Sequence, residues 1–401
     1  MTAVGERSPL RTYLASRALA LTGGSVAEAV LPLIVVLTLD GGAAAVGAVT
    51  AVTLVVSLTT RVPISAWVDA RPHQIRLQAF SQIAAAATAV LIPLLWWWDL
   101  LSLPTLLAAV VVIVLARTVV SSLGHTTVNQ LVPADDRVRA VGALNSLSSA
   151  ADIAGQSGGP ALLKLLPAPV IPLVDTAMNL VSAALVWRLR GYESRDQPGD
   201  AAETVTVRVS EVARSVMAQG PVQVLWLSGI VGSLLAPVTV VFLIRELDID
   251  PALVGVLMAC GALGGITGGL LAHRVLSRLA MWPLIAVSSA LSGAAAALLL
   301  SAPRLPGAVY PLVIGFEFLS ACAGTLLVAA VYGTLQTRTE HARIARVMSV
   351  ASTGMEGLAL VGIGAGVLVA ARWSELATIT TAAIGYLALA LIAVIAALRR
   401  R

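Results

Sequence analysis

Twelve stretches of the sequence are apolar for long enough to cross a lipid bilayer as a helix, and together they fill most of the 401 residues. A membrane-spanning helix needs about 20 predominantly apolar residues. Only 12% of the residues are charged, whereas soluble domains average about 25%. We therefore expect an all-α membrane protein with twelve transmembrane helices. The predicted spans are residues 12–38, 43–68, 77–98, 103–124, 141–165, 168–190, 221–244, 252–272, 281–302, 307–333, 345–371 and 375–398.

One long polar connection interrupts this pattern and leaves six spans on each side. We expect an N-terminal six-helix bundle at 1–190, a central cytoplasmic loop at 191–220 and a C-terminal six-helix bundle at 221–401. Arginines gather in both tails, in the central loop and in alternate short loops, which places that side in the cytoplasm by the positive-inside rule. Both termini are then cytoplasmic. These arginines account for the net charge of +5, so the charge does not indicate a nucleic-acid partner.

The two halves repeat each other at a constant offset of 204 residues. One register holds from the second span through the fifth, which chance does not explain. A duplicated six-span unit is typical of transporters that expose a central site alternately to each side of the membrane. The matched pairs are Ser65 with Gly269, Asp69 with His273, Asp136 with Glu340, Arg139 with Arg343, Ser148 with Ser352, Ser149 with Thr353, Asp152 with Glu356, and Gly158 with Gly362.

Three local sequences add to the repeat. Residues 65–71 read SAWVDAR, residues 269–274 read GLLAHR, and residues 155–160 read GQSGGP. With twelve spans in two repeats, they make the chain resemble the major facilitator superfamily over nearly its whole length, and in particular bacterial drug:proton antiporter-type exporters. The resemblance implies two pseudo-symmetric six-helix bundles, the major facilitator fold, in a bacterial cytoplasmic membrane.

The first two of these sequences follow the second span of each half and correspond to a family loop of the form Gly-x-x-x-Asp-Arg. Both copies are degenerate, because the first lacks the glycine and the adjacent arginine and the second lacks the acid. The resemblance implies an inner gate in which Asp69 acts with Arg71, Arg76 and Arg274.

The third sequence resembles a glycine- and proline-containing motif of the fifth span in family exporters. The resemblance implies that Gly155, Gly159 and Pro160 are associated with export. Ordinary close packing of two helices is the alternative, since small residues let helix backbones approach.

Charged side chains inside the spans are further candidates, because burying a charge in lipid is costly. In the resembled fold, Glu28 on span 1, Arg117 on span 4 and Glu317 on span 10 line the central cavity. Arg117 is long enough to reach Glu28, either to tune a proton-carrying acid or as a permanent ion pair. Glu317 has no obvious cationic partner within the spans, so we expect it to bind protons. Its alternative is a hydrogen bond to Thr325 or to another helix.

Three more acids lie within spans. Asp152 and Glu356 are repeat mates beside hydroxyl-bearing residues, and they are either gating or protonation acids or hydrogen-bonded structural acids. For Asp175, which has Asn179 one turn further on, we expect a structural role.

The sequence has no phosphate-binding Walker loop and no paired histidine ligands. We therefore expect no enzyme activity, cofactor or metal. The resemblance implies a monomeric secondary active transporter that exports a small apolar or amphipathic compound, such as a drug, antibiotic or siderophore, in exchange for protons. Uptake of a small metabolite by proton symport is one alternative. A membrane sensor or assembly partner that does not transport is another.

Overall fold

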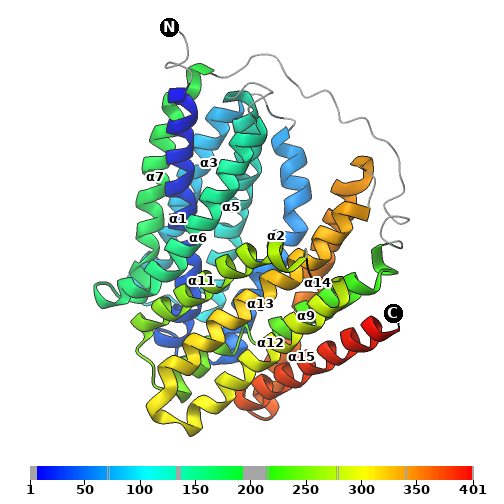
Figure 1. Cartoon of the computed structure of the whole chain (residues 1–401). Coiled ribbons are helices and arrows are strands. Elements are labelled where there is room, and N and C mark those ends of the chain that lie inside the picture. Colours follow the sequence, from blue (N-terminus) through cyan, green and yellow to red (C-terminus); the bar gives the residue numbers. More distant parts are fainter. Residues whose placement is uncertain are drawn as a thin grey trace. The chain divides into compact units, whose positions relative to one another are not determined.

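The computed structural model describes residues 7–69, 71, 73–131, 137–192, 214, 216–276, 278, 280–338 and 341–399. Within these ranges all regular secondary structure is helical (Figure 1). A helix satisfies its backbone N–H and C=O groups internally, as a lipid environment demands. Helical structure is present at each of the twelve predicted positions, so the all-helical part of the predicted fold class is confirmed.

In the described part of the chain, ten helical segments are long and apolar enough to span a membrane. The predicted spans at 141–165 and 221–244 are not among them. The first forms α6 (Arg137–Ala161), whose sequence is the more polar one because it carries Asp152 and Gln156. The second was predicted as one continuous helix, which is wrong. It breaks after α9 (Gly220–Ser233) into turns at 234–238, where Pro237 lacks an N–H donor.

The chain forms two compact units. Unit 1 comprises Met1–Gly41 and Val52–Thr204, and unit 2 comprises Gly42–Ala51 and Val205–Arg401. The short segment of unit 2 that precedes residue 52 is the beginning of α2 (Ala43–Asp69). Gly47 lets this segment lie close to Ile363, Val367 and Pro237, since a Cβ atom there would collide with Val367.

In unit 1, α1 packs against α6 and α7, while α3 packs against α5 and α7 (Figure 1). The contact between α1 and α6 is close because Gly155 and Gly159 have no side chains. A Cβ atom on Gly159 would lie 2.8 Å from the carbonyl oxygen of Val26. The elements of unit 1 are α1 (Arg7–Leu37), most of α2, α3 (Gln74–Ala89), α4 (Leu91–Trp97), α5 (Leu103–Leu131), α6, η2 (Leu162–Lys164), η3 (Ala168–Val170), α7 (Pro172–Arg188) and η4 (Leu189–Tyr192).

In unit 2, α11 packs against α13, α12 packs against α13 and α15, and α9 packs against α14. Glycines again set the closest approach, since Cβ atoms on Gly264 and Gly268 would collide with the α13 backbone at Phe318 and Cys322. The remaining elements of unit 2 are α10 (Thr239–Val241), the π-helical η5 (Phe242–Glu246), α11 (Pro251–Leu276), α12 (Met281–Ser301), η6 (Ala302–Arg304), η7 (Pro306–Ala308), α13 (Val309–Arg338), α14 (His341–Arg372) and α15 (Glu375–Leu398).

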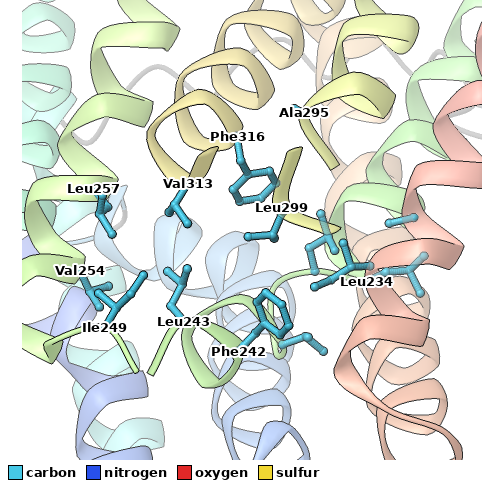
Figure 2. Packing of buried hydrophobic residues seen from close by; sticks show 14 of the residues in the cluster. Leu234, Phe242, Leu243, Ile249, Val254, Leu257, Ala295, Leu299, Val313 and Phe316 are labelled. Carbon is cyan, nitrogen blue, oxygen red and sulfur yellow. The ribbon is translucent and has the colours of Figure 1, made fainter. Parts of the chain in front are cut away.

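An apolar cluster fills unit 2 where the broken segment after α9 meets α11, α12 and α13. Figure 2 shows Phe316 and Val313 of α13 directed toward Leu299, with Leu243 and Phe242 of the broken segment on the other side. Phe242 is fully buried. This cluster forms one wall of the cavity described next.

Candidate functional site

Unit 2 contains a cavity of about 320 Å³ beside this apolar cluster. The volume suits a small organic molecule, because ligand pockets start at about 300 Å³. The break in α9 shapes one side of the cavity, and α11, α12, α13 and α15 form the others. Its lining is mainly apolar and comprises Gly232, Leu235, Ala236, Thr239, Val240, Leu243, Val254, Met258, Ser292, Phe316, Glu317, Ser320 and Tyr386.

Glu317 is the acidic residue of this lining and lies on α13. Gly261 of α11 leaves room for it, since a Cβ atom there would lie 3.1 Å from Glu317 Oε2. Within the described ranges, the Glu317 carboxyl group accepts no hydrogen bond and contacts no cation. The alternative of a bond from Thr325 is wrong, because the Thr325 hydroxyl donates to the Ala321 carbonyl oxygen at 2.9 Å.

An unpaired carboxyl group in apolar surroundings has two ways to avoid an isolated negative charge. It takes up a proton, or a ligand brings a positive charge or a hydrogen-bond donor. The hydroxyl groups of the lining are partly committed elsewhere: Ser320 donates to the Glu317 carbonyl oxygen at 3.1 Å, and Thr239 donates to that of Leu235 at 2.9 Å. The Tyr386 hydroxyl group lies against Gly232 of α9. A Cβ atom on Gly232 would lie 2.8 Å from that hydroxyl oxygen. The cavity thus combines an apolar wall with one acid and several hydroxyl groups.

Unit 1 holds a second charged site, in which Arg117 of α5 pairs with Asp175 of α7. The Arg117 Nη2 to Asp175 Oδ2 distance is 2.9 Å, and Asp175 is 1% exposed. Asn179 donates a further hydrogen bond of 2.6 Å to Asp175 Oδ1. Gly23 and Gly24 of α1 lie over this pair, and a Cβ atom on Gly23 would lie 2.8 Å from Asp175 Oδ1.

The predicted contact between Arg117 and Glu28 is therefore wrong in this structure. Glu28 is exposed, and it forms no ion pair with any residue that the structure describes. The physical reason is that α7 presents a fully buried acid to Arg117, and that acid needs a cation more than an exposed one does. The spacing of Asp175 and Asn179 by one turn was the sequence signal for this network, but the partner on α5 was not evident from it.

Asp152 and Glu356, the matched acids of the repeat, lie in different surroundings. Asp152 is exposed on α6 and accepts a 2.6 Å hydrogen bond from Ser25 of α1. This hydroxyl lies on another helix, whereas the sequence pointed to Ser148 and Ser149; the side chain of Ser149 lies outside the described residues. Glu356 is half-buried on α14 and lies within electrostatic range of Tyr332.

The structure describes the side chains of some residues of the predicted inner gate. Arg71 stacks on the Trp67 ring at 4.8 Å, and Arg76 and Arg274 are exposed. The side chains of Asp69, His273, Arg139 and Arg343, and all of Asp136 and Glu340, lie outside the described residues. The gate itself therefore stays a prediction.

Residues of the predicted export motif contribute to helix packing. Gly155 lies directly against Ser25 and Val26 of α1, and Gly159 against Val26 and Val30. Pro160 is buried near the end of α6. This is the close contact that small residues allow, and the association with export stays a prediction.

No protein-family model and no curated protein sequence matches this chain. Solved structures do match over nearly the whole length. A bacterial homologue of the human lysosomal transporter Spinster in an inward-facing state gives a TM-score of 0.71 at 16% identity, covering 99% of this chain and 96% of that one. A bacterial homologue of the iron transporter ferroportin, also inward-facing, gives 0.71 at 16% identity over 96% and 98%. The nucleoside transporter NupG gives 0.71 at 13% identity over 96% of each chain.

The likeness to these structures, together with the twelve helical positions, establishes the fold. The chain is a multi-pass membrane protein with the major facilitator fold.

Proposed function

We propose that this protein is a proton-coupled secondary active transporter that exports a small apolar or amphipathic compound. One observation carries the proposal: Glu317 lies in a cavity of about 320 Å³ with no cation or hydrogen-bond donor on its carboxyl group among the described residues. Nothing in that arrangement holds the acid permanently ionised. It is therefore free to exchange protons with whichever side of the membrane the cavity faces.

In the proposed cycle, the uncharged form of Glu317 is favoured when the cavity is apolar and closed. Opening to water, or arrival of a ligand that brings a positive charge or a hydrogen-bond donor, favours loss of the proton. A proton moving inward can thus be exchanged for a ligand moving outward. The solved structures with this fold include transporters described for nucleosides and for iron, so the substrate class is inferred from the cavity and not from the fold.

The other intramembrane charges have supporting roles in this proposal. The Arg117–Asp175 pair holds α5 against α7, and Glu28 is a second candidate proton site. Asp152 and Glu356 respond to the change between facing states. The direction of export rests on the resemblance of residues 155–160 to an exporter motif, and the inner gate on Asp69 and the nearby arginines.

Proteoliposomes under an imposed pH gradient test the proposal. A screen of amphipathic compounds should identify one whose movement is driven by the gradient, with protons moving in the opposite direction. Glu317→Gln should reduce this movement to that of empty liposomes while ligand binding is partly kept. Glu246→Gln is the matched control, because Glu246 is an exposed acid outside the cavity.

Three outcomes would contradict the proposal. Full gradient-driven transport by Glu317→Gln would remove Glu317 from the coupling role. Movement of protons and compound in the same direction would favour symport uptake. A complete absence of coupled movement in a folded wild-type protein would favour a non-transporting sensor or assembly partner.

A further inference from the structure

Arg17 of α1 is a buried cation without an acidic partner. Its side chain is 5% exposed. Its one hydrogen bond to a described residue runs from Nη1 to the Val120 carbonyl oxygen of α5 at 3.3 Å, and its Nε has no partner. No carboxylate in the described part of the chain pairs with it. A buried charge is costly unless an opposite charge compensates it, and one carbonyl dipole is only partial compensation.

Gln82 of α3 is a second buried polar side chain without partners. It is 0% exposed, and neither its Nε2 nor its Oε1 atom has a hydrogen bond. Buried polar side chains are satisfied in the large majority of cases. An orphaned amide group therefore points to a ligand or water that completes it.

The helix register brings these two side chains to the same level. Ser16 of α1 meets Ser182 of α7 and Gly23 of α1 meets Asp175, so α1 and α7 run in opposite directions. Phe80 of α3 meets Trp187 of α7 and Thr176 of α7 donates to the carbonyl oxygen of Ala86, so α3 is also antiparallel to α7. Helices α1 and α3 are consequently parallel to each other.

A direct contact fixes the level at which α1 and α3 meet, because Gln78 Nε2 donates to the Tyr13 hydroxyl at 3.2 Å. Arg17 lies four residues after Tyr13, and Gln82 lies four residues after Gln78. Each is one helical turn further along the same face of its helix. From this register we expect the Arg17 guanidinium group and the Gln82 amide group to lie in the next layer.

The neighbouring polar groups are already paired. Thr127 donates to Gln78 Oε1 at 2.6 Å, and the hydroxyl groups of Ser16 and Ser182 are 2.7 Å apart. Tyr13, Gln78 and Thr127 are all fully buried, so the surroundings are closely packed. The unused donors include the Arg17 Nε–H and the Gln82 amide group, beside the positive charge of Arg17.

We propose that Arg17 and Gln82 form a binding site for one small monatomic anion, of which chloride is the natural example. The anion would accept hydrogen bonds from both side chains and neutralise the guanidinium charge. We expect a polyatomic anion such as sulfate to be excluded, because Tyr13, Gln78 and Thr127 beside the site are fully buried. The site belongs to unit 1 and is independent of the role proposed for Glu317.

The first test is the thermal unfolding of the purified full-length protein in sodium gluconate, with chloride added at constant ionic strength. A ligand that binds the folded state raises the unfolding midpoint. We expect a saturable rise with chloride and with bromide, and none with sulfate. Absence of a chloride-specific rise in the wild-type protein overturns the proposal, because water then fills the site or the two side chains bond directly.

Variants test the location. Arg17→Gln should abolish the chloride response, and Gln82→Leu should raise the chloride concentration at half-effect by at least about tenfold, the loss expected for one hydrogen bond to a charged group. Arg190→Gln is the control, because Arg190 is an exposed arginine stacked on Trp187. An undiminished response in Gln82→Leu places the anion elsewhere, and this variant decides the matter even where Arg17→Gln fails to fold.

Bromide also allows direct observation. Anomalous diffraction from crystals grown in bromide should show a peak within hydrogen-bond distance of Arg17 and Gln82. Bromide peaks confined to other positions would overturn the assignment.

Discussion

The two units treat a charge inside the membrane in opposite ways. In unit 1, the acid Asp175 is closed off by Arg117 and Asn179. In unit 2, Glu317 faces a cavity, and no described residue pairs with its carboxyl group. Asp175, at 1% exposure, has protein partners on both carboxylate oxygens, whereas the carboxyl group of Glu317 has none among the described residues.

The internal repeat shows that this difference is not inherited from the shared scaffold. At the offset of 204 residues, Arg117 corresponds to Ala321, Asp175 to Ile379, and Glu317 to Ile113. Neither charge system has a counterpart in the other unit. The two halves of the repeat therefore carry different residues at the positions of these charges.

The largest effect on stability should come from opening the pair in unit 1. Asp175→Leu leaves Arg117 without its partner, and breaking a buried pair in this way costs about 3–5 kcal/mol. Thermal or denaturant unfolding in detergent measures this loss. The double variant Asp175→Leu with Arg117→Met should recover most of it, because an apolar pair removes the uncompensated charge. Equal destabilisation in the single and double variants would contradict the pairing.

A second comparison uses the repeat mates Gly158 and Gly362. A Cβ atom on Gly362 would collide with the Ile230 carbonyl oxygen, whereas one on Gly158 meets nothing within 4 Å. Gly362→Ala should therefore destabilise unit 2 by about 1–3 kcal/mol through overpacking. Gly158→Ala should be neutral or stabilising by up to about 1 kcal/mol, because alanine is the better helix former. A change of the same sign in the unfolding free energy of both variants would contradict the predicted difference between the two positions.

A smaller effect is expected at the contact between α1 and α6. Ser25→Ala removes the 2.6 Å hydrogen bond to Asp152. Because Asp152 is exposed and water replaces the lost donor, the destabilisation should be about 0.5–1 kcal/mol. Unfolding of Ser25→Ala, Asp152→Asn and the double variant measures the coupling. Strictly additive losses would mean that the two side chains act independently.

The smallest change in stability should follow replacement of the solitary acid. Glu317→Gln breaks no hydrogen bond or ion pair with a described residue, so the unfolding free energy should stay within about 1 kcal/mol of wild type. A loss as large as that of Asp175→Leu would reveal a hidden structural partner. With stability unchanged, any loss of gradient-driven transport in this variant reports on chemistry and not on folding.

Most of the helices could be predicted from the sequence. Lipid leaves few options for the backbone, so a run of about 20 apolar residues predicts a helix with little ambiguity. The interruption after Ser233 was missed because its residues are as apolar as those of a regular span, and Pro237 alone does not show whether a helix bends or breaks. Glu317 was found because a solitary acid within a long apolar run is conspicuous whatever its neighbours are.

The partner of Arg117 could not be predicted from the sequence in the same way. Depth along a span, estimated from helical rise, places a residue at a level but gives neither the direction of its side chain nor its neighbouring helix. That measure placed Glu28 within reach of Arg117 and gave no sign that Asp175 is its partner. In the structure, Gly23 and Gly24 of α1 lie over the pair, and the buried Asp175 contacts Arg117 in place of the exposed Glu28.

Residue order by itself determined the helical class, the positions of most helices, the repeat at an offset of 204 residues and the presence of a lone acid in span 10. These properties depend on how each segment meets lipid, which is a local matter of composition. Only the tertiary structure decided which acid pairs with Arg117, where the cavity around Glu317 lies, and that Arg17 and Gln82 are buried. Those properties depend on contacts between residues far apart in the chain, and a small difference in helix packing is enough to change them.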